Sequence, residues 1–442
     1  VHTIRYNVKE YFLINYYSIV QKHIDIKEIT VPTKKPCLYN FFNNGNMSKN
    51  KMVVFIRKYA MIIVLFCVLG LFAGLTGGNI LRPMNITSLI AQNAYVFILA
   101  AGMLLCILTG GNIDLSVGSI VCFTGAVGAT LMVKLGVNPV ISVIVMALVG
   151  AAIGAFQAFW IAYVRIPRFI VTLAGMLAFR GLSNVILNAT SISITEQKAF
   201  VKAFGGGADC YIPDVFGIQG FNLTCFLIGV VATVIYIALQ IKSRVDRIKK
   251  GYEGEKMSAF LLRVIPISVA IMWIITELSL DRGFPTVLIW IMAVVLIYGY
   301  ITSNTVTGRT FYAVGGNEKA TKLSGINTNK VYFLAYTNMG FLSAVAAMVT
   351  MARLTSAQPT AGNQYEMDAI GACFIGGASA YGGIGTIPGV IIGAILMGVI
   401  NMGMFLLGVN QDMCKVVKGA VLLAAVIFDV VSKRGFKIIA KN

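Results

Sequence analysis

Carboxylate and imidazole side chains carry much of the proton transfer, metal binding and catalysis in proteins, and this chain keeps them out of its apolar segments. Its two histidines, His2 and His23, both precede the first apolar segment. A proton-coupled carrier usually holds a carboxylate deep in the membrane, so this distribution disfavours proton coupling, while sodium coupling through backbone carbonyls stays open. The acidic residues after position 46, nearly all between apolar segments or at their ends, are Asp114, Glu196, Asp209, Asp214, Asp246, Glu253, Glu255, Glu277, Asp281, Glu318, Glu366, Asp368, Asp412 and Asp429.

The sequence also lacks the motifs of the common catalytic sites. It contains no GxxxxGK[ST] phosphate loop, no HExxH zinc motif and no GxSxG nucleophile turn, and residues 383–388 match GxGxxG only in part. We therefore expect that the protein is not an enzyme and that it holds no cofactor or metal. If ATP drives its work, a partner chain must bind the ATP and its Mg²⁺.

Long apolar helices are the elements available to position functional residues. The chain is 57% hydrophobic and 12% charged, which leaves too little polar surface for a soluble protein of 442 residues. We expect an all-α fold, a polytopic transmembrane helical bundle of about 10–12 spans that includes broken or re-entrant glycine-rich segments. The expected apolar segments are 59–76, 91–109, 115–135, 139–164, 169–187, 223–241, 260–280, 286–303, 331–353, 368–381, 387–407 and 415–431.

Basic residues give these spans a direction. The formal charge is +19, but the Lys and Arg residues lie in short segments between apolar runs, which fits membrane topology better than nucleic acid binding. We expect a multi-pass protein of the bacterial plasma (inner) membrane with both termini in the cytoplasm. This orientation places residues 165–168, 242–256, 304–330 and 433–441 inside and the long non-basic loop 188–222 outside.

The first 46 residues differ from the rest of the chain. They begin with Val, lack periodicity and precede Met47, which opens a charged lead into the first apolar segment. We interpret residues 1–46 as an upstream-shifted start, with a disordered tail or an amphipathic surface segment as alternatives. Residues 47–434 then form one transmembrane domain, with a cytoplasmic tail at 435–442.

Small residues are abundant and patterned. Glycines concentrate at 110–128 and 371–393, where helix packing is the favoured interpretation and unwound backbone along a pathway is the alternative. The eight cysteines form no CxxC pair and are typical of apolar core positions. A Cys210–Cys225 disulfide is the alternative if their loop is extracellular.

The most informative polar segment is 307–326, TGRTFYAVGGNEKATKLSGI, inside the expected cytoplasmic loop 304–330. Asn317 is a good helix N-cap, and Glu318 suits the positive end of the helix. Gly325 can end the helix in a left-handed conformation. The pattern predicts a helix of about two turns.

One face of this helix carries Ala320 and Leu323, as docking into a groove on a partner requires, although a connecting helix explains the pattern equally well. Residues 315–326, with Arg309 and Tyr312 before them, resemble the cytoplasmic coupling loop of the ribose, xylose and galactoside permeases of ATP-binding-cassette importers. That family is related to the branched-chain amino-acid permeases.

Three further segments resemble the same family in the expected order. They are GGNIDLSVG at 110–118, PRFIVTL with a following Arg-Gly pair at 167–181, and ACFIGGAS with GGIGT at 372–386. The resemblance covers roughly residues 59–433. Extra material around 241–280, with a basic loop and a further pair of spans, makes the chain most similar to the longer xylose or multiple-monosaccharide permeases.

The resemblance implies a permease subunit that moves a monosaccharide inward by alternating access. It also implies a permease homodimer in membrane lipid, ATPase subunits that dock from the cytoplasm, an extracytoplasmic sugar-binding protein that sets selectivity, and no nucleic acid partner. Branched-chain amino acids, nucleosides and autoinducers are alternative substrates. An ion-coupled sugar carrier and a membrane-embedded enzyme are rival classes whose acidic clusters are missing. The residues implied in ATPase coupling are Arg309, Tyr312, Gly316, Asn317, Glu318, Ala320, Leu323, Ser324 and Gly325.

Five polar residues are candidates for the translocation pathway: Asn112, Asp114, Ser116, Thr172 and Arg180. An Arg180 side chain near mid-membrane costs on the order of 3 kcal/mol, so it needs water in a cavity or a hydrogen bond to a helix end. Asp114 either caps a helix that begins near residue 115 or faces the pathway. Asn112 and Ser116 share these alternatives.

Overall fold

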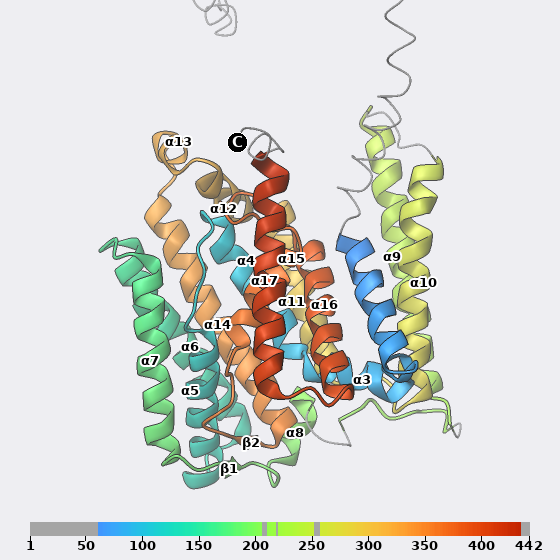
Figure 1. Cartoon of the computed structure of the whole chain (residues 1–442), viewed down its shortest axis with the longest axis horizontal. Coiled ribbons are helices and arrows are strands. Elements are labelled where there is room, and N and C mark those ends of the chain that lie inside the picture. Colours follow the sequence, from blue (N-terminus) through green and yellow to red (C-terminus); the bar gives the residue numbers. More distant parts are fainter. Residues whose placement is uncertain (1–60, 206–209, 218–219, 252–256, 435–442) are drawn as a thin grey trace, which may run out of the picture. The chain divides into compact units, whose positions relative to one another are not determined.

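A computed structural model of the chain describes residues 61–205, 210–217, 220–251 and 257–434. By their contacts, residues 1–58 and 59–442 form separate units, and the description concerns the second. The expectations for residues 1–46 and for the tail at 435–442 lie outside the described residues. Most helices are joined by short turns, and two longer connections, after residue 187 and after residue 354, each contain a short strand (Figure 1).

The first half of the described chain begins with an apolar helix at Met61–Leu75 and a 3₁₀ turn, η1. A single strand, β1, interrupts the helices that follow. The elements are η1 (Asn79–Leu81), α3 (Pro83–Gln92), α4 (Ala94–Leu108), α5 (Val117–Ala129), the π-helical η2 (Thr130–Lys134), α6 (Pro139–Ala162), α7 (Arg168–Leu187), β1 (Ile192–Ser193) and α8 (Lys198–Phe204).

The second half contains the extra pair of helices that the sequence predicts, α9 and α10, and the segment that resembles a coupling loop. Its elements are α9 (Leu223–Lys249), α10 (Met257–Leu280), α11 (Val287–Asn304), α12 (Val306–Gly316), α13 (Glu318–Leu323), α14 (Thr328–Leu354), β2 (Ser356–Ala357), α15 (Tyr365–Ile375), α16 (Ile387–Leu406) and α17 (Gln411–Arg434).

The all-α prediction is confirmed, and the described residues contain eight helices long and apolar enough to span a membrane. The count becomes nine when α3 and α4, which meet at a 42° bend, form one broken span. Three other expected spans fail that test: Met61–Leu75 and α15 are short, and α17 carries charges. These three explain the difference from the expected 10–12 spans.

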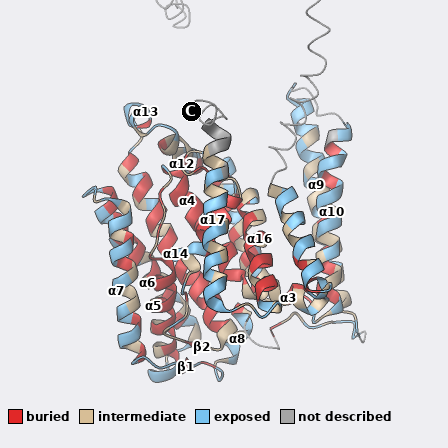
Figure 2. Cartoon of the chain, in the orientation of Figure 1, coloured by how far each residue is buried: buried red, intermediate tan, exposed pale blue. Residues whose placement is uncertain are grey.

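The core lies around α4 and α14. Every residue of α4 is buried, whereas α7, α9, α10 and α17 expose much of their length (Figure 2). Glycines permit the close packing of α14 on α6: a Cβ at Gly150 would lie 2.6 Å from the Gly340 carbonyl oxygen. A buried apolar helix surrounded by partly exposed apolar helices is what a membrane bundle needs, because lipid covers the outer faces.

Two ends of the bundle can be distinguished by their contacts. At one end β1 pairs antiparallel with β2, which joins the loop after α7 to the loop after α14. At the other end the Arg165 side chain binds Glu318 of α13, so the α6–α7 turn and α13 lie together. We name these the strand end and the α13 end.

The α9–α10 pair has its own small core, formed by Cys225, Ile275, Leu278 and Phe284. The pair is fastened at the strand end, where the Asn222 backbone N–H donates to the Ser279 carbonyl at 2.8 Å. Cys210 and Cys225 are both free thiols, and the Cys210 thiol contacts the Val201 carbonyl. The disulfide alternative is therefore wrong, and the apolar interpretation of Cys225 is confirmed.

Candidate coupling helix and membrane cavity

Helix α13 has the caps that its sequence predicts. The Asn317 side chain accepts a hydrogen bond from the Ala320 N–H at 3.0 Å, and Gly325 adopts a left-handed φ of 88°. Leu323 is 89% exposed, and Ala320 beside it is also exposed. An apolar side chain so exposed on a polar turn is available to a partner.

Helix α12 precedes α13 and was not anticipated from the sequence. Its N-cap is Thr305, whose hydroxyl accepts from the Gly308 N–H at 3.0 Å. Arg309 is exposed on α12, and the Tyr312 hydroxyl donates to the Gly385 carbonyl at 2.8 Å. Burial raises the pKa of Tyr312, so this phenol stays protonated and keeps its donor role at neutral pH.

The end of α12 lies against two other motifs. A Cβ on Gly315 would be 1.8 Å from the Leu108 carbonyl oxygen and 2.4 Å from the Gly383 N–H nitrogen. Gly383 itself donates to Leu108 at 3.0 Å. A Cβ on Gly111, whose φ is +74°, would be 1.8 Å from the Ala380 carbonyl oxygen. These contacts are possible only without side chains.

Three motifs of the family resemblance thus meet through their backbones at the α13 end. We name this meeting place, formed by residues 108–112, 315–318 and 380–385, the junction. Arg168, from the fourth motif, also reaches it: its guanidinium donates to the Asn112 side-chain oxygen at 2.9 Å. The four segments are far apart in the sequence but form one structural unit.

Glu318 ties α13 to this unit. Its carboxylate accepts from Arg165 at 2.9 Å and from the Tyr332 hydroxyl at 2.8 Å. Partial burial alone would raise the pKa of Glu318, but the hydrogen bonds from Tyr332 and Arg165 outweigh it and hold the pKa below its ordinary value. Glu318 is therefore ionised at neutral pH. The Arg168 guanidinium lies 4.3 Å from the centre of the Tyr332 ring and completes the chain of contacts to Asn112.

A pocket of about 790 Å³ opens beside these residues. Its walls come from the turns after α4 and α6, from the start of α7, and from α12, α13 and α14. The lining residues are Thr109, Gly110, Arg165, Arg168, Val314, Gly315, Gly316, Asn317, Glu318, Lys319, Lys322 and Tyr332.

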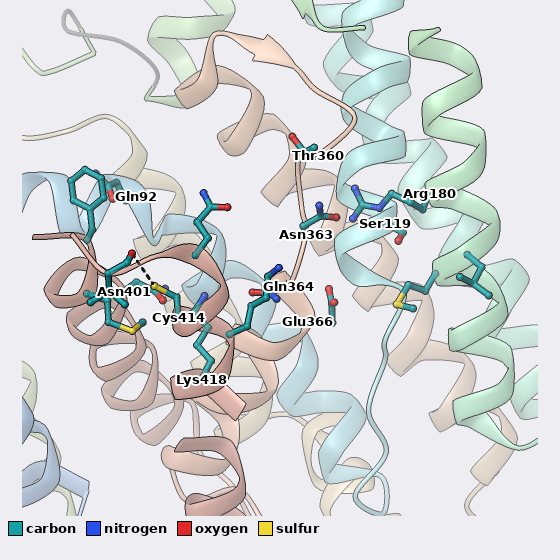
Figure 3. Close-up of a pocket in the computed structure, with 17 residues that line it drawn as sticks. Gln92, Ser119, Arg180, Thr360, Asn363, Gln364, Glu366, Asn401, Cys414 and Lys418 are labelled. Atoms are coloured by element: carbon teal, nitrogen blue, oxygen red, sulfur yellow. Dashed lines mark hydrogen bonds between the residues drawn. The ribbon is translucent and has the colours of Figure 1, made fainter. Parts of the chain in front are cut away.

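A second, larger cavity of about 840 Å³ lies elsewhere in the bundle. Figure 3 shows Ser119 and Arg180 on one side of it, Asn401 and Lys418 on the other, and Gln364 between them. Its lining comes from α3, α5, α7, α15, α16, α17, the loop before α15 and the turn between α16 and α17. The lining residues are Gln92, Ser119, Met176, Leu177, Arg180, Thr360, Asn363, Gln364, Glu366, Asn401, Met404, Phe405, Val409, Gln411, Cys414, Lys415 and Lys418.

Of the five pathway candidates, Arg180 lines this cavity. Its guanidinium also donates to the carbonyls of Pro359 and Ala361, at 3.1 and 2.6 Å. Arg180 thus lines a cavity and also donates hydrogen bonds, to carbonyls of the loop before α15 rather than to a helix end, and its place on a translocation pathway stays a prediction. Its hydrogen bonds hold the loop before α15 against α7.

The other pathway candidates lie in the helix packing, outside the cavity lining. Asn112 donates to Thr109, and the Thr172 hydroxyl donates to the Arg168 carbonyl. Asp114 accepts from the Ser116 N–H and hydroxyl, at 2.9 and 2.6 Å, just before α5 begins. Asp114 thus accepts a backbone amide in the turn before α5, as expected, although the N-cap residue of this helix is Ser116.

A buried ion pair stabilises one wall of the cavity. Lys418 of α17 lies 2.8 Å from a carboxylate oxygen of Asp368 on α15, and Tyr95 of α4 donates to that carboxylate at 2.6 Å. The Asp368 side chain is 1% exposed. Most acidic residues in the described part of the chain lie in loops or at helix ends, as expected. Asp368 is an exception: it lies in the first turn of α15, and its side chain is buried inside the bundle.

Sequence reasoning missed Lys418, Asn401, Gln364 and the role of Asp368. Lys418 sits in an apolar run with Lys415 and Asp412 nearby, and three charges within two helical turns were the available signal. The amides come from separate elements with no common spacing, so nothing in the sequence brings them together.

Comparison with known proteins agrees with the geometry. Residues 85–426 match the family described as "Branched-chain amino acid transport system / permease component". The chain is 35% identical over 379 residues to the xylose transport system permease protein XylH of Escherichia coli (strain K12), covering 86% of this chain and 93% of that protein.

Two other relatives are similar at comparable levels. The XylH protein of Haemophilus influenzae is 34% identical and covered over 97% of its length, with 86% of this chain matched. The ribose import permease protein RbsC of Escherichia coli (strain K12) is 35% identical, with 79% of this chain and 87% of that protein covered. No solved structure matches at a significant level. The chain belongs to this family of transport permeases, the one that includes the xylose and ribose permease proteins.

Proposed function

We propose that the protein is the membrane subunit of an importer for a monosaccharide, driven by an ATPase that docks on α13. The observation that carries the proposal is the combination of an exposed Leu323 with a buried attachment of the same helix. Glu318 fixes α13 to α14 through Tyr332, which is 1% exposed, so a force on Leu323 is passed into the bundle. A helix that merely connects two spans needs no such attachment.

The orientation follows from this role. An ATPase works in the cytoplasm, so the α13 end faces inside and the strand end faces outside. The basic residues Arg165, Arg168, Lys319 and Lys322 around the junction support this orientation. The loops at 188–222 and 355–364 then face the exterior, where a sugar-binding protein delivers its ligand.

The cavity supports a second permease copy as partner. Lys415 and Lys418 line it from α17, a helix with much of its length exposed. Charged and amide groups are not stable against hydrocarbon, so lipid alone is a poor cover for this region. A second copy of the chain would close the cavity and complete a pathway between the two permeases.

Sugar as substrate, rather than an amino acid, is supported by the similarity to xylose and ribose permease proteins over most of the chain. We propose a pentose such as xylose as the first substrate to test.

The direct test is uptake of labelled xylose into vesicles that contain the permease, its ATPase and its binding protein. We expect Leu323→Asp to lower ATP-dependent uptake at least tenfold and to abolish co-purification of the ATPase, while the permease remains folded because Leu323 is exposed. Leu323→Met keeps an apolar side chain and is the matched control. Uptake that persists without ATPase and ATP but collapses with an ionophore would overturn the proposal.

A further inference from the structure

The large cavity has the chemistry of a site for an uncharged polyhydroxylated molecule. Five of its lining residues carry amides and two carry hydroxyls, and both groups donate and accept hydrogen bonds, as sugar hydroxyls do. These seven residues are Gln92, Asn363, Gln364, Asn401, Gln411, Ser119 and Thr360. A passage that only lets water and solute through does not need so many two-way hydrogen-bonding groups.

Each of the three cations in the lining already has a partner within the protein. Lys415 pairs with Asp412 at 2.7 Å, Lys418 pairs with Asp368 at 2.8 Å, and the Arg180 guanidinium donates to two backbone carbonyls. Because each cation is engaged within the protein, the cavity offers little to an anionic sugar or a sugar phosphate. Its ligand should be neutral.

Several polar groups in the lining are left for a ligand. Within the described part of the chain, the side chains of Gln92, Asn363, Gln364 and Gln411 make no hydrogen bond to the protein. Glu366 adds a carboxylate, which can accept hydrogen bonds from two neighbouring hydroxyls at once. A Cβ on Gly118 would lie 2.6 Å from the Oε2 atom of Glu366. Gly118 thus makes room for Glu366 at the wall of α5.

The segment that carries these groups is held in place. Gln364 has a left-handed φ of 65°, a conformation that residues other than glycine rarely adopt and that often marks ligand sites. Arg180 fixes the same loop from α7, and a Cβ on Gly362 would lie 2.1 Å from the Gly118 carbonyl oxygen. The loop therefore presents Asn363 and Gln364 from a rigid base (Figure 3).

From these observations we propose that the permease itself contains a binding site for a neutral monosaccharide, built on Asn363, Gln364 and Glu366 and supported by the Asp368–Lys418 pair. The proposal rests on the proposed transport function and deepens it. Selectivity would then be shared between the external binding protein and the permease, contrary to our expectation that the binding protein alone sets it.

The first test is binding of labelled D-xylose to the permease alone in lipid nanodiscs, with D-glucuronate as an anionic competitor. We expect saturable xylose binding in the millimolar range that glucuronate does not displace. Asn363→Ala and Glu366→Gln should each weaken binding at least tenfold. Glu196→Gln, an exposed carboxylate in the loop after β1, is the matched control and should bind as the original chain does.

The second test is uptake in vesicles with the binding protein unchanged, comparing labelled xylose with labelled ribose. Asn363→Ala should change the xylose-to-ribose uptake ratio at least threefold, which a purely structural residue would not do. Thermal unfolding of each variant separates lost binding from lost folding, and Asn363 is exposed enough for its variant to fold.

Absence of saturable binding by the original chain, with ATP-driven xylose uptake intact, would overturn the site and leave the transport function standing. Equal binding by the original chain and both variants would overturn the placement. A fully assembled importer that takes up no sugar would instead count against the proposed function.

Discussion

The junction and the cavity are built in opposite ways. The junction joins backbone to backbone, and its glycines fall within short segments such as 110–118 and 315–326. The cavity joins side chains from six helices and two connecting segments, each of which contributes one to four residues. Along α7, Arg168 at the junction and Arg180 at the cavity are twelve residues apart, or about 18 Å. A requirement for glycine leaves a compact trace in a sequence, whereas a cavity lined by dispersed side chains does not.

The largest expected effect is on the cavity side, at the buried ion pair. Asp368→Asn leaves the Lys418 ammonium without its counter-charge in a site where the carboxylate is 1% exposed. Breaking a buried pair in this way costs about 3–5 kcal/mol. We expect a large drop in the melting temperature of the purified permease, measured in detergent by fluorescence-detected unfolding.

The double variant Asp368→Asn with Lys418→Gln separates charge from packing. It removes the uncompensated ammonium, so it should be more stable than Asp368→Asn alone. If the double variant is no more stable than the single one, the charge of the pair does not stabilise the cavity. The cavity and the junction would then not differ in this respect.

The next effect tests the backbone contacts of the junction. Gly315→Ala would place a Cβ 1.8 Å from the Leu108 carbonyl oxygen, so the helices must separate, at a cost of about 1–3 kcal/mol. Gly299→Ala, in α11, is a matched control, because a Cβ there has no neighbour within 4 Å. We expect uptake to fall at least tenfold in the first variant and to stay near the original level in the second. Equal uptake in the two variants would show that the close approach is dispensable.

The helix α13 at the junction can be predicted from the sequence because the signals that specify it are local. Asn317, Glu318 and Gly325 specify α13 by local capping, which depends only on neighbours in the chain. The apolar lengths specify most of the spans in the same way. That three glycine motifs contact one another is a tertiary fact, which the separate motifs do not indicate.

The remaining features depend on contacts that no local pattern encodes. Helix α12 was missed because its two terminal glycines weaken the helical pattern, and in the structure the first of them, Gly315, makes the close contact with Leu108. Asp368 was placed at the end of a span because an apolar run begins there. Its burial arises from Tyr95 and Lys418, which are 273 and 50 residues away along the chain.

A smaller effect is expected at the polar link between α13 and α14. Tyr332→Phe removes the hydroxyl that donates to Glu318 and leaves the ring in place under Arg168. Hydrogen bonds to charged groups contribute about 1.5–3 kcal/mol, and the partial exposure of Glu318 brings the expected loss to the lower end. Uptake should fall more than ATPase activity, so the ratio of sugar moved to ATP hydrolysed is the measurement. An unchanged ratio would mean that Tyr332 is not part of the coupling path.

The smallest expected effect on stability concerns Arg165, whose φ of 63° is left-handed. Its ion pair with Glu318 is 41% and 36% exposed on the two side chains, so it contributes about 0–1 kcal/mol. Arg165→Ala loses the pair and keeps the backbone strain, while Arg165→Gly loses the pair and relieves strain of about 1–2 kcal/mol. We therefore expect Arg165→Gly to be at least as stable as Arg165→Ala in thermal unfolding.

The same two variants separate stability from coupling at the junction. Both lack the guanidinium that holds Glu318, so both should lower ATP-dependent uptake by a similar factor, whatever their difference in melting temperature. If uptake instead follows melting temperature, Arg165 acts only on stability. The Arg165–Glu318 pair at the junction would then have the same role as the Asp368–Lys418 pair at the cavity. A shared loss of uptake would establish that the charged link at the junction serves transmission, while the charged pair at the cavity serves the fold.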